Sequence, residues 1–146
     1  MGAASILHYL GWPDIGEHRE LVKIVILDSP YADLTLIVKT HVWGSSILTG
    51  CAKLGLHFIN KKTKQLAGLD ILNFKPKEFA SKCTHDVSAL FLHGEQDTFI
   101  WLDHLHQNFT ALKSSDKHQL VFKGTHTSKR QKDVCQRVYE FIKDWL

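Results

Sequence analysis

The sequence contains little cysteine, and its three cysteines are Cys51, Cys83 and Cys135, with no CxxC spacing. This usage predicts neither a disulfide framework nor a zinc site, and it favours a reducing, cytoplasmic location. No apolar run approaches the roughly 20 residues that a membrane-spanning helix requires. Residues 1–10 lack a basic segment followed by an apolar stretch, so no signal peptide is predicted.

An excess of one charge is also missing, because 18 Lys and Arg face 15 Asp and Glu, for a net charge of +3. The pairs Lys61–Lys62 and Lys129–Arg130 are interpreted as solvated surface, and without a concentrated basic stripe a nucleic-acid partner is not expected. No phosphate-binding glycine loop or dinucleotide fingerprint occurs, so no cofactor is predicted. A length of 146 residues with 44% hydrophobic content fits one domain with a sizeable core.

What the sequence does contain is a series of apolar runs that alternate with helical patterns. Runs at 22–27, 87–92 and 119–122 are apolar on both faces and end in turn residues, as buried parallel strands do. Apolar residues at helical spacing follow each run, and a short helix before the first run ends at Gly11 and Pro13. The alternation predicts an α/β fold with a parallel sheet.

Residues 40–82 fit this alternation least well. Gly44, Gly50, Gly55 and Gly68 are expected to interrupt any long helix there, and the segment is longer than an ordinary crossover. We interpret it as an insertion that lies over the carboxyl ends of the strands, where open α/β sheets bind ligands.

Reactive groups belong just past the strand ends of a parallel sheet, where a rigid scaffold holds the loops. Two expected strands lead into such groups, because residues 93–97 read HGEQD and residues 124–126 read GTH. The carboxylate of Asp97 and the imidazole of His126 can meet at this edge and form the acid–base half of a catalytic triad. The residues alone leave an equal alternative, in which Asp97 caps a helix and His126 is a polar loop residue.

These two motifs also carry a resemblance. HGEQD at 93–97 and GTHTSKR at 124–130 look like the closing third of an α/β-hydrolase, and are most similar to cytosolic serine hydrolases of the Bem46 and serine-aminopeptidase-like kind. The resemblance implies a partial α/β-hydrolase fold of about three parallel strands, equivalent to the family's last three, flanked by helices. Residues 1–146 would then be the carboxyl-terminal portion of the domain, with 40–82 as a cap-like connection.

The same resemblance implies catalytic roles for Asp97 and His126 and exposes a gap at the nucleophile. The family's elbow reads GxSxG, and MGAA at residues 1–4 matches it from the residue after the serine. Gly2 would be the last elbow glycine, packed too closely for a side chain, and the backbone N–H of Met1 would line the oxyanion hole. The serine itself is missing, since Ser29 lacks the elbow glycines and is interpreted as structural, as Ser5 is.

Three other polar residues offer alternatives at the expected strand ends and in the helix that follows. Asp28 ends the first strand, where some α/β-hydrolases keep their acid, but its expected role is to cap the turn at 28–30. Asp97 is preferred because its whole motif matches. His104 and His106 stand two residues apart in a helical pattern, where their side chains diverge, so surface histidines are expected and no metal site.

Two functional hypotheses follow from these residues. In the first, the complete protein is a serine hydrolase of ester, thioester or amide bonds in small-molecule, acyl or peptide substrates, and the chain without its serine is inactive alone. In the second, the chain is a non-catalytic pseudohydrolase that binds a partner, because the edge of strand 22–27 would be unpaired and inclined to associate. A flavodoxin-like domain ranks below both, since it would need more strands and a phosphate site.

Overall fold

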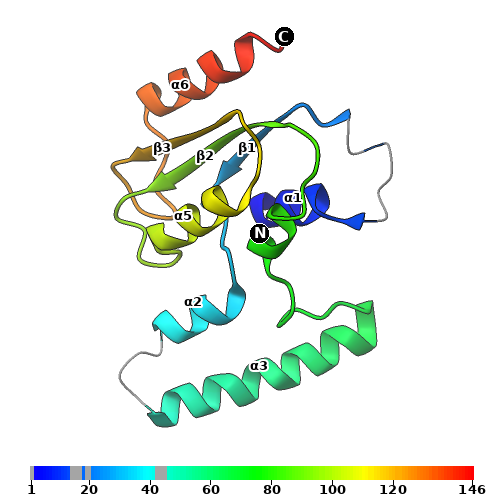
Figure 1. The fold of residues 1–146 in the computed structure, drawn as a ribbon. Helices are drawn as coiled ribbons and strands as arrows, with labels where there is room; N and C mark the ends of the chain where they lie inside the picture. Colours follow the sequence, from blue (N-terminus) through cyan, green and yellow to red (C-terminus); the bar gives the residue numbers. More distant parts are fainter. Residues whose placement is uncertain (1, 14–17, 19–20, 42–45) are drawn as a thin grey trace. The chain divides into compact units, whose positions relative to one another are not determined.

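The chain divides into two compact units, one of Met1–Ala32 with Pro76–Leu146 and one of Asp33–Lys75. A computed structural model describes residues 2–13, 18, 21–41 and 46–146 (Figure 1). The first unit holds the sheet and every residue predicted to act in catalysis, of which Met1 lies outside the described residues.

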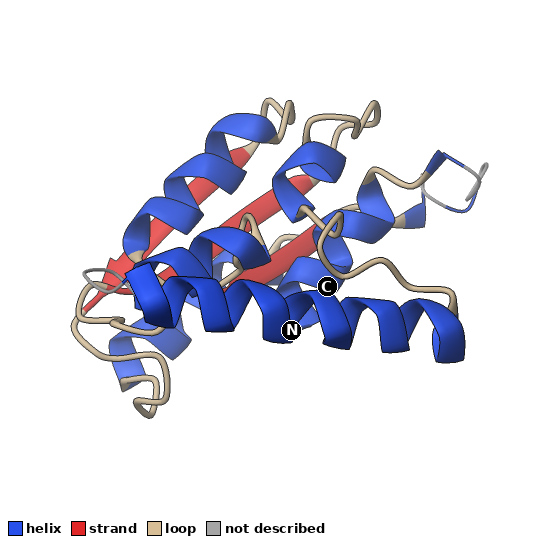
Figure 2. Cartoon of the chain, turned by 90° about the horizontal axis from the view of Figure 1, so that it is seen from below, coloured by secondary structure: helices blue, strands red, loops and turns tan. Residues whose placement is uncertain are grey.

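Three parallel strands form the sheet of the first unit, which confirms the predicted strand type. They are β1 (Ile24–Asp28), β2 (Ser88–Gly94) and β3 (Lys117–Phe122), in the spatial order β1-β2-β3, and they lie side by side in Figure 2. The central strand β2 is buried along its whole length, as its apolar character on both faces predicted. The strand β3 begins two residues earlier than predicted, because Lys117 pairs with Ala89 despite its polar side chain.

One face of the sheet is covered by α1 (Gly2–Leu10), α4 (Pro76–Ala80) and α5 (Leu102–Ala111). Alternate strand residues point to this face, and they form a core with apolar residues of the helices: Leu7, Leu10, Val25, Leu27, Ala80, Ala89, Phe91 and Leu105. The burial of these side chains is the main favourable contribution to the stability of the unit.

The opposite face is covered by α6 (Lys132–Lys143), as Figure 1 shows. The intervening strand residues Leu90 and Leu92 of β2, with Leu120 and Phe122 of β3, pack against Val134 of this helix. Helices on both faces make the three-layer arrangement expected of a parallel sheet.

The predicted end of the first helix at Gly11 is confirmed, and the packing explains why glycine stands there. The helix α1 packs against α4, and a Cβ atom on Gly11 would lie 1.9 Å from the carbonyl oxygen of Phe79. Only a residue without a side chain permits this approach of the two backbones.

The second unit contains α2 (Leu34–His41) and α3 (Ser46–Ala67). Asp33 begins α2, since its Oδ1 accepts the backbone N–H of Thr35 at 2.8 Å. The prediction that glycines interrupt any long helix here was wrong for Gly50 and Gly55, which lie inside the 22-residue α3. A single helical glycine costs only about 1 kcal/mol, and neighbouring helix-forming residues offset it.

Gly68 acts as predicted and ends α3, with a φ of +67° that favours glycine and an N–H that donates to the carbonyl of Lys64. Gly44 lies outside the described residues. Within the described part of the chain, no helix is long and apolar enough to cross a membrane.

Candidate functional site

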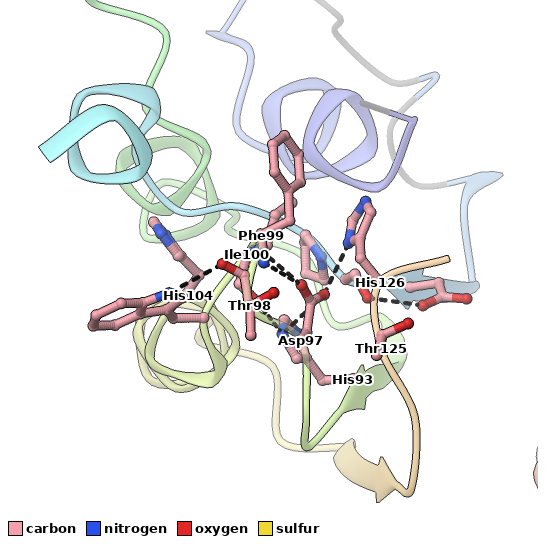
Figure 3. A network of polar contacts seen from close by, with 12 residues as sticks. His93, Asp97, Thr98, Phe99, Ile100, His104, Thr125 and His126 are labelled. Carbon is pink, nitrogen blue, oxygen red and sulfur yellow. Dashed lines mark hydrogen bonds and ion pairs between the residues drawn. The ribbon is translucent and has the colours of Figure 1, made fainter. Parts of the chain in front are cut away.

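Asp97 and His126 meet at the carboxyl edge of the sheet, although 29 residues separate them in the sequence. Asp97 lies in the loop after β2, His126 lies in the loop after β3, and the Asp97 Oδ2 atom is 2.8 Å from the His126 Nδ1 atom (Figure 3). The neighbouring parallel strands bring both loops to one edge, as the sequence predicted.

The second carboxylate oxygen of Asp97 is held by its own loop. Its Oδ1 atom accepts the backbone N–H groups of Phe99 at 3.0 Å and Ile100 at 2.8 Å, and its side chain is fully buried. Asp97 therefore holds local backbone donors with one oxygen and contacts His126 with the other. It does not cap the following helix, as the alternative interpretation expected, because the N-cap residue of α5 is Trp101. The carboxylate is fixed in orientation before any substrate arrives.

Backbone hydrogen bonds join the two loops directly. The N–H of Glu95 donates to the carbonyl of Phe122 at 2.9 Å, and the N–H of Gln96 donates to the carbonyl of Gly124 at 3.0 Å. A Cβ atom on Gly94 would lie 2.4 Å from the same Gly124 oxygen. The glycine of the HG motif is thus required by the close approach of the loop that carries His126.

The ring of His126 is one-third exposed, and its second nitrogen is available for chemistry. In the described part of the chain, no hydrogen-bond partner contacts its Nε2 atom. The half-exposed ring of Phe99 lies beside it, with the ring centroids 5.2 Å apart. An imidazole that is bound to a carboxylate through Nδ1 and open at Nε2 can accept a proton from a hydroxyl group and donate it again.

A second histidine, His93, lies behind Asp97 and was not singled out from the sequence beyond its place in the HGEQD motif. It is fully buried, its Nε2 atom is 2.7 Å from the carbonyl oxygen of Ile100, and Asp97 Oδ2 is 3.6 Å away. Because a carbonyl only accepts, His93 donates from Nε2. Burial lowers the pKa of His93, which favours its neutral form.

Asp28, the alternative catalytic acid, is bound to Arg130 instead. The guanidinium donates from Nε to Asp28 Oδ2 at 2.9 Å and from Nη2 to Oδ1 at 2.8 Å, and this hydrogen bonding raises the pKa of Arg130. The guanidinium also lies 4.5 Å from the ring centre of Phe122. The interpretation of Arg130 as merely solvated surface was therefore wrong, while Lys129 is exposed as predicted.

Arg130 also connects this ion pair to the loop of His126. Its Nη1 atom donates to the carbonyl of Ser128 at 2.7 Å, and the Ser128 hydroxyl oxygen accepts the backbone N–H of Thr125 at 2.7 Å. The residue before His126 is therefore tied, through Ser128 and Arg130, to the end of β1 at Asp28. No local sequence signal predicts this pair, because its members lie 102 residues apart.

Of the two positions of the expected nucleophile elbow, only Gly2 lies within the described residues. Met1, the candidate oxyanion-hole residue, lies outside the described residues. Gly2 was predicted to be closely packed, and this was wrong, since a Cβ atom there would meet nothing within 4 Å. As the first residue of α1, Gly2 is exposed and no described backbone approaches it.

The two candidate serines occupy positions consistent with structural roles. Ser29 is buried, its hydroxyl donates to Asp28 Oδ1 at 3.1 Å, and its backbone has a φ of +48°. Ser5 is exposed on α1.

The expectation of two surface histidines in α5 was wrong for His104 and right for His106, which is exposed. His104 is buried, and its Nδ1 atom accepts the backbone N–H of Ala32 at 3.1 Å. Asn108, one helical turn later, donates from Nδ2 to the carbonyl of Pro30 at 3.0 Å. These two side chains fix the chain after β1 against α5. Among the described residues, no group of three or more His, Cys, Asp or Glu side chains is placed to hold a metal ion.

Comparison with solved structures identifies the fold. The chain is similar to the esterase Pf2001 of Pyrococcus furiosus, with a TM-score of 0.61 and 13% identity over 97% of this chain and 49% of the esterase. An acylaminoacyl peptidase of Pyrococcus horikoshii gives a TM-score of 0.58 and 17% identity, over 99% of this chain and 22% of the peptidase. Mouse alpha/beta hydrolase domain-containing protein 10 gives a TM-score of 0.56 and 17% identity, over 99% of this chain and 59% of the mouse protein.

Neither protein-family models nor curated protein sequences match the chain. The structural similarity, together with three parallel strands flanked by helices, shows a partial α/β-hydrolase fold, as the sequence motifs predicted. The chain spans about half the length of the Pyrococcus furiosus esterase.

Proposed function

We propose that Asp97 and His126 are the acid and base of a serine-hydrolase triad that acts on ester, thioester or amide bonds. The single observation that carries this proposal is the 2.8 Å contact between a fully buried Asp97 carboxylate and a partly exposed His126 imidazole. Burial strengthens the interaction of the carboxylate with the ring, and exposure lets the far nitrogen reach a substrate.

In this mechanism, Asp97 accepts the Nδ1–H of His126 and so presents the Nε2 lone pair to the nucleophile. His126 takes the proton of a serine hydroxyl as that oxygen attacks the carbonyl carbon, and then gives the proton to the leaving group. A water molecule, activated by the same nitrogen, releases the acyl group and restores the serine.

The nucleophile is proposed to come from polypeptide that, in the complete hydrolase, precedes the residues described. Six serines each have their hydroxyl in a hydrogen bond that does not involve His126: Ser29, Ser81, Ser88, Ser114, Ser115 and Ser128. The half-length match to an esterase supports the view that residues 1–146 form a portion of an α/β-hydrolase domain. The HGEQD and GTHTSKR motifs favour its carboxyl-terminal portion, with 40–82 as a cap-like connection. Within the superfamily, HGEQD and GTHTSKR favour the Bem46 and serine-aminopeptidase-like kind.

Transcript sequencing provides the direct test of this proposal. Codons for GxS, in frame and immediately before the Met1 codon, would support it, and an in-frame stop codon at that place would contradict it. A hydrolase assembled from those codons should react with a fluorophosphonate probe at the added serine, and His126→Gln should abolish this reaction. Labelling of the chain of 146 residues alone would also contradict the proposal, since the nucleophile is proposed to lie outside it.

One observation favours the pseudohydrolase as a second candidate. In the described part of the chain, β1 pairs only with β2 and forms an edge of the sheet. A cavity of about 510 Å³ lies beside it, lined mainly by apolar side chains that include Ile6, Tyr9, Ile24 and Ile26. An open strand edge beside an apolar cavity is suited to pairing with a strand of another chain. A stable monomer with no partner would count against this candidate.

A further inference from the structure

We propose that α3 binds to the surface of an anionic lipid membrane, with its axis in the plane of the interface. This inference concerns the second unit and does not depend on the Asp97–His126 pair. It is based on the distribution of exposed apolar, basic and packed side chains around one helix.

The first observation is a set of large apolar side chains that α3 exposes. Leu54, Phe58, Ile59 and Leu66 each expose between 54% and 77% of their surface. At about 100° per residue these four side chains span an arc of about 140° around the helix. Single exposed apolar residues are ordinary, whereas several large ones on the same side of one helix mark an interaction surface.

The second observation is where the helix is packed. Asn60 is the buried polar residue of α3, and its Oδ1 atom accepts the backbone N–H of Leu72 at 3.2 Å. Asn60 and the half-buried Leu56 fall outside the apolar arc when the same helical angle is applied. The apolar arc is therefore not the side of α3 that holds the segment after it.

The third observation is charge. The 22 residues of α3 include four lysines and no Asp or Glu, and the unit Asp33–Lys75 has six lysines and two aspartates, for a net charge of +4 against +3 for the whole chain. Lys61 falls about 20° from Leu54, just outside the apolar arc, and Lys62 falls within it, whereas Lys53 and Lys64 fall beside Asn60 on the packed side. Only Lys64 of the four is paired with a carboxylate in the described residues, that of Asp70.

An anionic lipid surface matches the apolar arc together with Lys61 and Lys62. The apolar arc enters the boundary between headgroups and acyl chains, while Lys61 at its edge reaches lipid phosphates and carboxylates. Lys62, which falls within the apolar arc, can extend its charged end to the headgroups while its stem stays in the apolar layer. A nucleic acid would use the lysines but leave the apolar arc exposed to water.

Sedimentation with vesicles tests the proposal on the whole chain. Vesicles of phosphatidylcholine with about one-third phosphatidylserine should bind the chain at least roughly tenfold more tightly than phosphatidylcholine alone, and high salt should release it. Lys61→Gln combined with Lys62→Gln should weaken binding roughly 25-fold, at about fivefold per lysine. Phe58→Ser should weaken it roughly tenfold or more.

Matched controls change the same residue types outside α3. One control combines Lys123→Gln with Lys132→Gln and so removes two exposed lysines. The other, Leu21→Ser, removes an exposed leucine. All three residues lie in the first unit. These variants should bind as the wild type does. If Phe58→Ser does not fold by circular dichroism, Leu66→Gln replaces it.

Three results would overturn the proposal. The first is equal binding to both kinds of vesicle, or none to either. The second is an equal effect of the α3 variants and their controls. The third is a dimer that Phe58→Ser dissociates, or binding to single-stranded RNA that the lysine variants weaken, in a chain that does not bind vesicles.

Discussion

Replacing Gly94 by alanine should destabilise the first unit and separate Asp97 from His126. The added Cβ atom would lie 2.4 Å from the carbonyl oxygen of Gly124 and 2.9 Å from its carbonyl carbon. Both neighbours are backbone atoms, so the clash is relieved only if the two loops move apart. Gly94 ends β2, and Gly124 lies two residues before His126, so this movement alters the site itself.

The expected cost combines two contributions. Overpacking against a rigid neighbour costs about 1–3 kcal/mol. Moving Gly124 also weakens the bond from the Gln96 N–H to its carbonyl, which contributes about 1 kcal/mol. Gly94→Ala should therefore lower the free energy of unfolding by about 2–4 kcal/mol. Urea unfolding followed by circular dichroism measures this change.

Gly2→Ala is the matched control in the same unit, because a Cβ atom there would meet nothing within 4 Å. Its free energy of unfolding should stay within about 0.5 kcal/mol of the wild-type value. The proton on Nδ1 of His126, observed by NMR, reports on the bond to Asp97, and its signal should be lost or shifted in Gly94→Ala only. Equal stability of the two variants would refute this account of the loop contact.

Three further perturbations address the same edge of the sheet. Asp97→Asn should remove the NMR signal of the His126 Nδ1 proton, because an amide can donate to that nitrogen and reverse the tautomer; persistence of the signal would contradict the assignment. Arg130→Lys should lower the free energy of unfolding, measured with urea, by about 1 kcal/mol. Lysine retains the charge but not the two-pronged contact with the partly exposed Asp28. A free energy of unfolding equal to that of the wild type would contradict the pairing. Burial lowers the pKa of His93 from its usual value of 6.5, so the unfolded chain binds this proton first. The free energy of unfolding should therefore fall as the pH drops below about 6.5. His93→Gln should reduce the slope of this free energy against pH, measured by urea unfolding between about pH 7 and 5, by up to about 1.4 kcal/mol per pH unit.

The sheet and the contact between Asp97 and His126 were predictable because both follow from the apolar strands and the turn residues after them. The strands β1 and β2 are apolar on both faces, and this pattern is typical of buried parallel strands when turn residues follow it. Asp97 and His126 follow adjacent strands, so the topology alone brings them to one edge. Their contact needed no information beyond strand order and direction.

The rest of the site depends on pairings that no local pattern encodes. Asp28 and Arg130 meet only after three strands have assembled, and His104 is buried because the chain after β1 returns to α5. The length of α3 was underestimated for a different reason. Gly50 and Gly55 lower helix propensity without preventing a helix that is otherwise rich in good helix formers.

The two histidines beside Asp97 differ in burial, and this separates their roles. Both have a nitrogen near Asp97 Oδ2, but His93 Nε2 is 3.6 Å away, too far for a hydrogen bond, whereas His126 Nδ1 is at 2.8 Å. His93 instead donates to Ile100, whose N–H binds the other carboxylate oxygen. The buried His93, whose lowered pKa favours its neutral form, thus keeps the loop of Asp97 in place without competing for Oδ2, and of the two rings only the one-third exposed His126 is open to solvent.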